Sequence, residues 1–348
     1  MKVLITGGAG YIGSTIAACC ADSGITPVIL DDYSTGLSGF SRPYANYTGD
    51  IADTAVIRQV LSNHPDVDSV IHCAAKIVVP DSVSAPLDYY DTNVAKPITL
   101  IRELSRLGVR RFILSSTASL YEPGDDHLVD ESSEVAPQSP YSASKWMLER
   151  VLRDFAATGS MDAIALRYFN PIGADPLLRS GLQDPHPTHA LGKMIEAHRE
   201  GGTFTVTGTD WPTRDGSGLR DYVHVWDLAR AHVSALQNFD EVIARSDTPG
   251  FDIINLGTGT GTTVFELVNA FGAATGTPLA VQTAPPRQGD VVGCATLTGK
   301  AARLLNWHAE LSIAEGVRSS LEWSQRLPLV LRNETEDAAT TGASDVRR

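Results

Sequence analysis

The fold of this chain is decided by Lys2-Val3-Leu4-Ile5-Thr6-Gly7-Gly8-Ala9-Gly10-Tyr11-Ile12-Gly13. The apolar half predicts a buried strand, and a helix-like segment follows Gly13 as far as about Asp22. The glycines at 7, 10 and 13 let the turn close tightly, let backbone amides approach an anion, and let the helix pack on the strand. This order of strand, glycine-rich turn and helix predicts a dinucleotide-binding unit.

The residues after the next expected strand indicate which dinucleotide is bound. Strand 27–30 ends on Asp31 and Asp32, about eighteen residues after Gly13, where an acidic side chain can bind the ribose hydroxyls of adenosine. A carboxylate there repels a 2′-phosphate, so we expect NAD in preference to NADP. The alternative is a glycine-rich turn beside an ordinary acidic loop.

Strands and helices continue to alternate through the first half of the chain. We expect helices at 52–62 and 91–107 and strands at 69–74 and 111–116. This order predicts a Rossmann-like, doubly wound parallel sheet of the α/β class, with ligands at the carboxyl ends of its strands. Candidate ligand contacts at three such ends are Asp50 and Ile51, then Cys73, Ala74 and Ala75, then Ser115, Ser116 and Thr117. Asp50 could equally serve its own turn, as aspartate often does.

The candidate reactive group lies in the stretch Gln138-Ser139-Pro140-Tyr141-Ser142-Ala143-Ser144-Lys145. Ser139 and Pro140 read as an N-cap and a first helical residue, which places Tyr141 and Lys145 on one helix face. An adjacent ammonium and the positive end of the helix dipole both favour the phenolate. We therefore expect Tyr141 to be a general base and acid whose pKa is lowered by Lys145. By itself the Tyr141–Lys145 spacing is weak evidence for catalysis, because such pairs are more often solvated surface residues.

Composition narrows the class of protein. With 28 basic and 41 acidic residues the chain lacks the basic footprint of a nucleic-acid-binding protein. Its four cysteines show no metal or disulfide spacing, so no metal site is expected. There is no cleavable leader and no apolar run long enough to span a bilayer, which predicts a cytoplasmic protein without a membrane partner.

Together these motifs resemble an extended short-chain dehydrogenase/reductase, and three further runs narrow the resemblance to the UDP-glucose 4-epimerases. Those runs are 167–174 (Arg-Tyr-Phe-Asn-Pro-Ile-Gly-Ala), 215–225 (Asp-Gly-Ser-Gly-Leu-Arg-Asp-Tyr-Val-His-Val) and 286–290 (Pro-Arg-Gln-Gly-Asp). The resemblance covers about residues 1–325. It implies an isomerase of galactose metabolism that inverts C4 of a UDP-hexose through a transient 4-keto sugar, with no net redox change.

The resemblance also implies roles for individual residues. Tyr141 would take the proton of the 4-hydroxyl, Thr117 would hydrogen-bond the reacting oxygen, and Lys145 would also bind the nicotinamide ribose. Residues implied to border NAD are Gly7, Gly10, Tyr11, Ile12, Gly13, Asp31, Asp32, Asp50, Ile51, Cys73, Ala74, Ala75, Asn93, Tyr141, Lys145 and Phe169. Residues implied to contact the UDP-sugar are Thr117, Asn170, His189, Arg220, Arg287, Asp290 and Cys294. The family usually forms homodimers through helices of its first domain.

The second half reads as a smaller α/β substrate-binding domain. We expect an NAD-binding domain over 1–170, with segments near 221–257 returning to it, and a UDP-sugar-binding domain over 171–328. Helices are expected at 190–200, 225–238, 264–274 and 312–325. Residues 333–348 contain little that could form a core, which predicts a disordered tail.

Some positions depart from the family pattern. Lys76 stands one place before the usual lysine, which leaves any cofactor role in doubt, and Thr188 and His189 replace paired asparagines. At Cys294 many bacterial members have a tyrosine, and a smaller residue leaves room for a 2-acetamido group. We therefore expect possible action on UDP-GlcNAc and UDP-GalNAc as well. The alternative is that Cys294 is a small buried residue whose neighbours fill the gap.

Other functions remain open at this stage. Ala118 and Ser119 stand where related dehydratases place acids, which disfavours dehydration. A 4-epimerase of UDP-glucuronate or a UDP-pentose would use the same chemistry. A non-catalytic NAD-sensing protein would not need Tyr141, Lys145 and Thr117 together. A reductase that consumes NADPH is disfavoured by Asp31.

Overall fold

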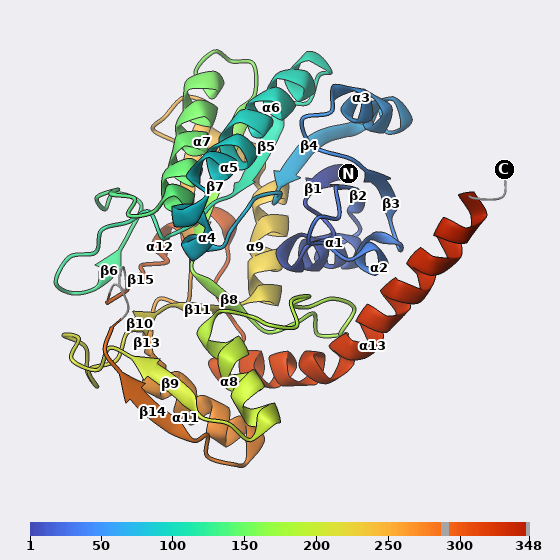
Figure 1. The fold of residues 1–348 in the computed structure, drawn as a ribbon. Coiled ribbons are helices and arrows are strands. Elements are labelled where there is room, and N and C mark those ends of the chain that lie inside the picture. Colours follow the sequence, from blue (N-terminus) through green and yellow to red (C-terminus); the bar gives the residue numbers. More distant parts are fainter. Residues whose placement is uncertain (287–291, 346–348) are drawn as a thin grey trace.

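A seven-stranded parallel sheet forms the centre of the molecule (Figure 1). The computed structural model describes residues 1–286 and 292–345, with side chains as far as 336. The strand order is β12-β7-β5-β4-β1-β2-β3, and each neighbouring pair is parallel. The predicted doubly wound sheet is confirmed. Its strands are β1 (Lys2–Thr6), β2 (Thr26–Asp31), β3 (Ala45–Thr48), β4 (Val67–His72), β5 (Arg111–Ser115), β7 (Asp162–Tyr168) and β12 (Phe251–Leu256).

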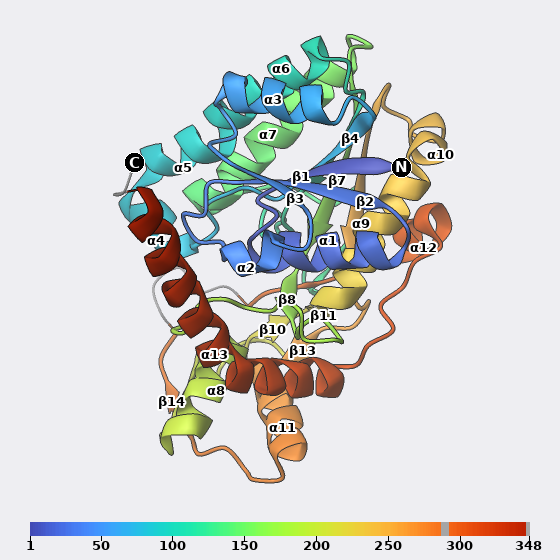
Figure 2. The same cartoon turned by 90° about the vertical axis from the view of Figure 1, so that its right-hand side faces the viewer.

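Helices cover both faces of this sheet, as Figure 2 shows. Alternate residues of β1 point to opposite faces, so Val3 and Ile5 join one apolar core and Leu4 joins the other. The first core includes side chains of α1 (Tyr11–Asp22) and α9 (Val225–Gln237). The second includes side chains of α3 (Thr54–Asn63), α6 (Lys96–Arg106) and α7 (Pro140–Ala156). Burial on both faces explains the continuous apolar runs of the strands.

A smaller unit lies beyond the carboxyl edge of the sheet (Figure 1). Its core packs α8 (Ala190–Glu200), α11 (Val264–Thr275) and the start of α13 (Ile313–Asp345) against a parallel strand pair. That pair is β9 (Phe204–Thr207) and β14 (Val281–Ala284). Three short pairs join the units, β8 (Asn170–Ile172) with β11 (Tyr222–His224), β10 (Leu219–Arg220) with β13 (Thr262–Thr263), and β6 (Leu128–Val129) with β15 (Ala295–Thr296).

Shorter helices complete the described chain. They are α2 (Ser38–Ser41), α4 (Val79–Ser84), α5 (Pro86–Tyr90), the π-helix η1 (Asp91–Ala95), α10 (Phe239–Ala244) and α12 (Gly299–Leu305). α4 and α5 pack on α7, and η1 runs directly into α6. Part of the helix expected at 91–107 is thus a π-helix, a form that often occurs at functional sites.

The end of the chain differs from the disordered tail expected over 333–348. Helix α13 continues to Asp345, and residues 346–348 lie outside the described part. Leu327 and Leu331 pack in one cluster with Phe40 of α2, and the carboxylate of Glu334 accepts a hydrogen bond of 2.9 Å from Ser38 Oγ. Contacts with α2, together with strong helix formers such as leucine, arginine and glutamate, explain why the helix continues past 325.

Candidate active site and cofactor site

The glycine-rich turn between β1 and α1 has the close approaches that its sequence predicts. Gly7 has a φ of +71°, in the left-handed region, and a Cβ added there would lie 2.5 Å from the amide nitrogen of Ala74. A Cβ added to Gly13 would lie 2.2 Å from the carbonyl oxygen of Gly7. The Tyr11 hydroxyl donates to Gly173 O at 2.6 Å. Gly10 is the N-cap of α1, and no side chain caps this helix start. The uncapped helix start fits a pyrophosphate group.

Gly13→Ala is expected to lower both the bound NAD content and the melting temperature. The methyl group would overlap the backbone of Gly7, and overpacking of this kind costs about 1–3 kcal/mol. Cofactor released on denaturation and a thermal melt measure the two effects. Gly299→Ala is the matched control, because no atom lies within 4 Å of a Cβ added there. A Gly13→Ala protein with wild-type NAD content would contradict this account of the turn.

Two acidic side chains lie at the carboxyl end of β2. Asp31 accepts hydrogen bonds from the amides of Ala9 at 2.9 Å and Tyr33 at 2.8 Å, so its carboxylate is fixed over the turn. Burial raises the pKa of Asp31, and these two amide bonds oppose that effect. Asp32 accepts from the amide of Ser34 at 2.9 Å. Because each carboxylate oxygen has a second lone pair, Asp31 can still accept from ribose hydroxyls.

The residues expected beside the adenine have structural partners. Asp50 accepts from the amide of Ala52 at 2.8 Å and forms an ion pair with Lys96. Ile51 is buried in the core that contains α3 and α6. These contacts give Asp50 a role in its own turn, and contact with adenine stays a prediction.

Small residues follow β4, where the sheet borders the turn. Cys73 Sγ lies 3.2 Å from Ser115 Oγ at the end of β5, and Ala74 lies directly against Gly7. Burial raises the pKa of the Cys73 thiol to about 11, so the thiol is neutral at physiological pH. Cys73 therefore contacts the end of β5 and Ala74 contacts the turn, and Ala75 comes next in the chain.

Asn93 in η1 holds the loop that follows β4. Its side chain accepts from the amide of Lys76 at 2.8 Å and donates to the carbonyl of Lys76 at 2.9 Å. It also donates to Ser144 Oγ at 3.0 Å, on α7 next to Lys145. In the described chain these bonds explain the burial of Asn93 as a support of the site. The Lys76 ammonium lies 3.3 Å from the Asp88 carboxylate.

Helix α7 begins where the sequence predicts. Ser139 is the N-cap, its Oγ accepts from the amide of Ser142 at 3.2 Å, and Pro140 is the first helical residue. The reciprocal bond from the Ser139 amide to Ser142 Oγ, at 3.1 Å, completes a capping box. This fixed start presents Tyr141 from the first turn of the helix.

Tyr141 lies beside Thr117, which follows the end of β5. Burial raises the pKa of Tyr141 to about 12, a hydrogen bond with Thr117 lowers it in part, and Tyr89 raises it. The Thr117 hydroxyl also donates to Ser119 Oγ at 3.0 Å. The candidate catalytic residues Thr117, after β5, and Tyr141 and Lys145, on α7, lie at the carboxyl edge of the sheet, which is called the catalytic edge below.

The ammonium of Lys145 is directed at the sheet. Its Nζ donates to the carbonyl oxygen of Ser115 at 2.9 Å, and the side chain is 3% exposed. Burial lowers the pKa of Lys145 to about 8, against the opposing fields of Cys73 and Glu149. The expectation that Lys145 lowers the pKa of Tyr141 therefore needs correction. In the protein without cofactor, burial is the largest effect and raises the pKa of Tyr141. The Lys145 ammonium donates its hydrogen bond to the Ser115 carbonyl in β5.

Two residues expected to hold the substrate lie on the short strand pairs between the two units. The amide of Asn170 on β8 donates to the carbonyl of Asp221 at 3.1 Å. Arg220 on β10 donates through Nη1 to the carbonyls of Leu219 at 2.6 Å and Val292 at 2.9 Å. Gly293 has a φ of +95°, and a Cβ there would lie 2.1 Å from Arg220 Nη1. A glycine at 293 thus lets the chain cross closely over the arginine.

Cys294 lies near Ala118, the residue after Thr117, and near Arg220. It is 9% exposed and joins an apolar cluster with Ala118 and Tyr121, against which Phe169 packs. Burial raises its pKa to about 11, and Arg220 opposes this. Two expected substrate contacts, Arg287 and Asp290, lie outside the described residues.

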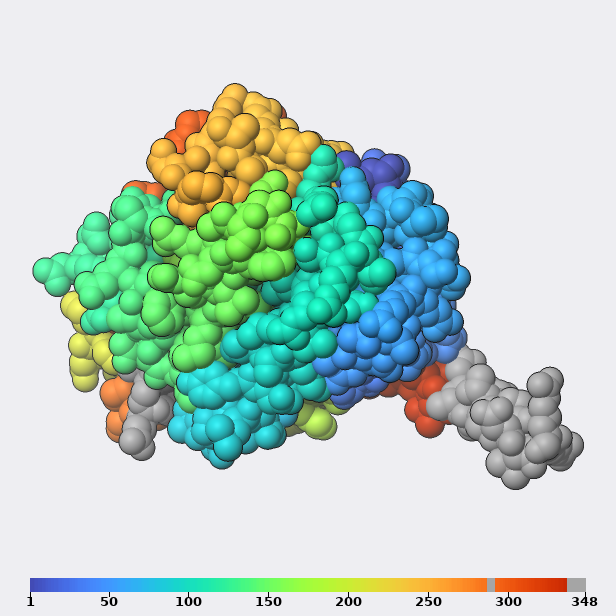
Figure 3. All heavy atoms as spheres, turned by 90° about the horizontal axis from the view of Figure 1, so that it is seen from above, coloured from blue at the N-terminus to red at the C-terminus, as the bar shows by residue number. Residues whose placement is uncertain are grey.

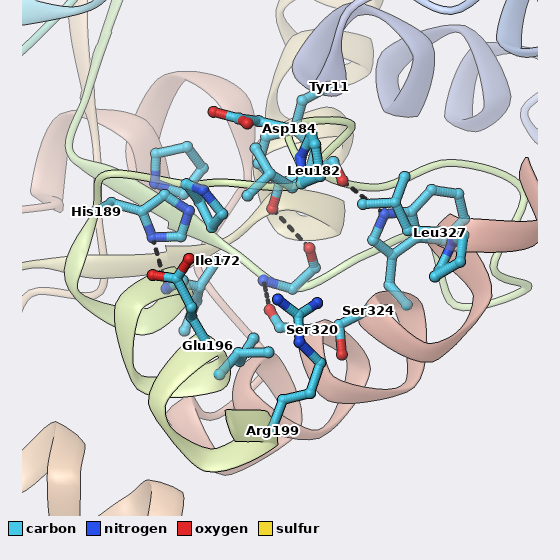
Figure 4. Close-up of a pocket in the computed structure, with 18 of the residues that line it drawn as sticks. Tyr11, Ile172, Leu182, Asp184, His189, Glu196, Arg199, Ser320, Ser324 and Leu327 are labelled. Carbon is cyan, nitrogen blue, oxygen red and sulfur yellow. Dashed lines mark hydrogen bonds between the residues drawn. The ribbon is translucent and has the colours of Figure 1, made fainter. Parts of the chain in front are cut away.

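His189 forms part of a different pocket (Figure 4). Its Nδ1 accepts from the amide of Gly192 at 3.2 Å and caps α8. The pocket measures about 260 Å³. Its lining includes Tyr11, Ile172, Leu182, His189, Trp323 and Leu327. Neither Tyr141 nor Lys145 lines it, so it is separate from the catalytic edge.

Two charged residues behind Lys145 are missed by sequence reasoning. Glu149 and Arg167 form a buried ion pair of 2.6 Å beneath the catalytic edge. The available signal was spacing, because Tyr141, Lys145 and Glu149 recur every four residues on one face of α7. Among the described residues, no group of three or more His, Cys, Asp and Glu side chains is placed to hold a metal ion. No helix of the described chain is long and apolar enough to cross a bilayer.

Known proteins resemble this chain over nearly its whole length. The model of the NAD dependent epimerase/dehydratase family matches residues 3–257. A UDP-glucose 4-epimerase of Rhizobium meliloti (strain 1021) is 38% identical over 328 residues, covering 93% of this chain and 97% of the relative. The structure of a UDP-glucose 4-epimerase from Stenotrophomonas maltophila with bound NAD and formylated UDP-arabinopyranose has a TM-score of 0.87 at 33% identity, covering 94% of this chain and 99% of that one. A UDP-Glc/GlcNAc 4-epimerase from Campylobacter jejuni has a TM-score of 0.79 at 31% identity, covering 93% and 99%.

Proposed function

This chain belongs to the NAD dependent epimerase/dehydratase family, and on that premise we propose that it is an NAD-dependent UDP-hexose 4-epimerase, an isomerase. The observation that carries the proposal is the meeting of Thr117, Tyr141 and Lys145 at one edge of the sheet, beside a turn shaped for a dinucleotide. The substrate pair is UDP-glucose and UDP-galactose, as in the relative from Rhizobium meliloti.

The side chains of the catalytic edge have distinct tasks in this reaction. Tyr141, in its phenolate form, receives the proton of the sugar 4-hydroxyl, and as the phenol it returns that proton after the sugar has turned over. Thr117, already hydrogen-bonded to Tyr141, orients the reacting oxygen. Lys145, whose ammonium donates to the Ser115 carbonyl, would also hold the ribose of the cofactor. NAD, when bound, would supply reversible hydride transfer at C4.

The same residues account for the binding of the two reactants. The turn at Gly7–Gly13 and the carboxylate of Asp31 suit the pyrophosphate and ribose of NAD. Arg220 supplies a fixed cation, and an arginine fork matches the oxygens of a diphosphate in a chain that carries a formal net charge of −13. Asn170 lies on β8, which pairs with the strand that follows Arg220.

The assignment is tested by incubating the purified protein separately with UDP-galactose, UDP-GalNAc and UDP-glucuronate, without added cofactor, and separating the 4-epimers. UDP-glucose should form from UDP-galactose. Turnover of UDP-glucuronate alone would replace the hexose assignment by a uronate one. Bound NAD with no turnover of any of the three would favour a non-catalytic protein.

We propose further that N-acetylated hexosamines are substrates. Cys294 is a small side chain in a cluster with Ala118 and Tyr121, and a small residue at this position suits a larger substituent on the sugar better than an aromatic ring would. The relative from Campylobacter jejuni acts on both glucose and N-acetylglucosamine forms.

Cys294→Tyr is expected to reduce kcat/KM for UDP-GalNAc by at least about tenfold while UDP-galactose turnover changes little. The added ring would take the volume that a 2-acetamido group needs. Parallel assays with both sugars give the ratio, and Cys294→Ser is the control that keeps the small volume. Equal losses on the two sugars would contradict a role in sugar selection.

We also propose that the protein forms a homodimer through the face made by α4, α5 and α7. The cyan segment with α4 and α5 lies beside the green segment with α7 in Figure 3. Large apolar side chains are exposed there, among them Val83 at 65%, Leu87 at 79% and Trp146 at 42%. Exposed apolar groups gathered on one face are typical of an interface.

Leu87→Glu is expected to convert the dimer to a monomer. A carboxylate at the centre of an apolar interface would be desolvated without a partner. Light scattering after size-exclusion chromatography measures the mass. Leu177→Glu, at a side chain that is 68% exposed outside this face, should leave the dimer intact. A Leu87→Glu protein that stays dimeric would place the interface elsewhere.

A further inference from the structure

A buried ion pair lies directly behind the catalytic edge. Arg167 on β7 donates through Nε to Glu149 Oε1 at 3.0 Å and through Nη2 to Oε2 at 2.6 Å. The two side chains are 3% and 4% exposed. The hydroxyl of Ser116 also donates to the Glu149 carboxylate. This carboxylate therefore ties together β5, β7 and α7.

Folding stability does not by itself explain why a buried ion pair of this kind is present. Removing two charges from water costs several kcal/mol, and apolar residues of similar volume often serve a fold as well or better. The position of the pair suggests another reason. Ser116 precedes Thr117, Glu149 lies one helical turn after Lys145, and Arg167 lies two residues before Phe169. Each of these three side chains therefore lies within four residues, along the chain, of a residue of the proposed site.

The same arginine connects this point to the substrate side. Its guanidinium carbon lies 4.8 Å from the centre of the Tyr121 ring, and the Tyr121 hydroxyl donates to Asn255 Oδ1 at 2.7 Å. Asn255 donates to Thr296 Oγ1 at 3.1 Å, two residues after Cys294. A continuous set of buried contacts thus joins α7 to the strand that follows Cys294.

Glu149 is a carboxylate on the same helix as Lys145, and its field acts on the Lys145 ammonium. Burial and Lys145 lower the pKa of His72 to about 3, and burial lowers that of His232 to about 4, so both imidazoles are neutral. Burial raises the pKa values of the Cys73 thiol and the Tyr168 phenol, so both groups are neutral near pH 7. Cys73, when ionised, and Glu149 both raise the pKa of Lys145 against burial.

We propose, on the basis of the function proposed above, that Glu149 and Arg167 are positioning residues for the epimerisation. Glu149 keeps the buried Lys145 in its ammonium form, and Arg167 fixes Glu149 while limiting its charge. The pair also holds the strand end with Thr117 in register with Tyr141 on α7. Neither residue touches the reacting atoms.

The test is the pH profile of kcat/KM on UDP-galactose for Glu149→Gln and Arg167→Gln. Loss of the Lys145 proton limits activity at alkaline pH. Glu149→Gln removes a carboxylate whose field favours the Lys145 ammonium and leaves the Arg167 cation without its partner, so the alkaline limb should move down by about one pH unit. Arg167→Gln leaves the Glu149 carboxylate without its cationic partner, so the alkaline limb should move to higher pH. Shifts of opposite sign support the proposal, and shifts of the same sign or none overturn it.

Folding is checked by circular dichroism and by bound NAD, because a single unpaired charge in the interior is destabilising. If a single variant does not fold, Glu149→Gln with Arg167→Gln removes both charges. It should fold and show kcat reduced about tenfold with KM within about twofold, and an unchanged kcat would overturn the proposal. Asp154→Asn, which breaks the exposed Arg150–Asp154 pair of the same helix, is the control. An inactive wild type would refute the proposed function itself, whereas an active wild type with unshifted variants refutes this inference alone.

Discussion

Tyr141→Phe is expected to reduce kcat on UDP-galactose by about a thousandfold or more while NAD stays bound. Loss of a positioned acid–base group removes about 10²- to 10⁴-fold of rate, and this phenol would serve in both the removal and the return of the proton. The substitution deletes one oxygen from a buried side chain and leaves the start of α7 intact, since the cap is formed by Ser139 and Ser142.

Rates from initial-velocity assays and NAD content from denatured protein test this expectation together. Tyr47→Phe is a matched control, because the Tyr47 hydroxyl contacts Asn63 in α3 and His64 at its C-cap. Tyr47 lies on the edge strand β3, which β4, β1 and β2 separate from β5. A Tyr141→Phe enzyme within about tenfold of wild type, with full NAD content, would remove Tyr141 as the proton acceptor.

Lys145→Met is expected to reduce turnover at least about a hundredfold and to make the protein more stable. Burial lowers the pKa of Lys145 to about 8 from an ordinary value of 10.5. The ammonium therefore destabilises the folded state below pH 8 by about 3 kcal/mol. Methionine removes that penalty and loses one hydrogen bond to Ser115, worth about 1 kcal/mol. The net gain in unfolding free energy at pH 7 should be about 2 kcal/mol.

The sign of the pH dependence gives an independent check on Lys145. Between pH 8 and 10.5 the unfolded state binds the proton and the folded state does not, so this group makes stability rise with pH in that window. Urea unfolding at pH 7 and pH 9.5, in excess NAD, should show the rise in the wild type and lose this contribution in Lys145→Met. A less stable variant with the same pH dependence would contradict the buried ammonium.

Strong local signals explain which parts of the fold were predictable. The expected helix 190–200 matches α8, and the expected start of α7 at Pro140 is confirmed, because caps and apolar spacing act within a few residues. Strand β3 carries Asn46 and Thr48 on an exposed edge and shows no apolar alternation. The course of α13 beyond 325 depends on its contacts with α2, which no local pattern encodes.

The residues that form the candidate site were easier to predict from sequence than the way in which their side chains are arranged. Spacing places Tyr141 and Lys145 on one face of α7, yet the direction of the ammonium depends on β5, whose Ser115 carbonyl accepts its proton. In the same way, Glu149 becomes significant only when β7 brings Arg167 to it. Side chains that meet across the sheet are fixed by tertiary packing, which single-sequence patterns do not record.

The most direct test of the central claim is the fate of deuterium carried at C4 of UDP-galactose. Purified protein without added cofactor should form UDP-glucose that keeps the deuterium at C4, because hydrogen is removed and returned inside one closed site. Loss of the label to solvent, or product formation only with stoichiometric added cofactor, would contradict the account.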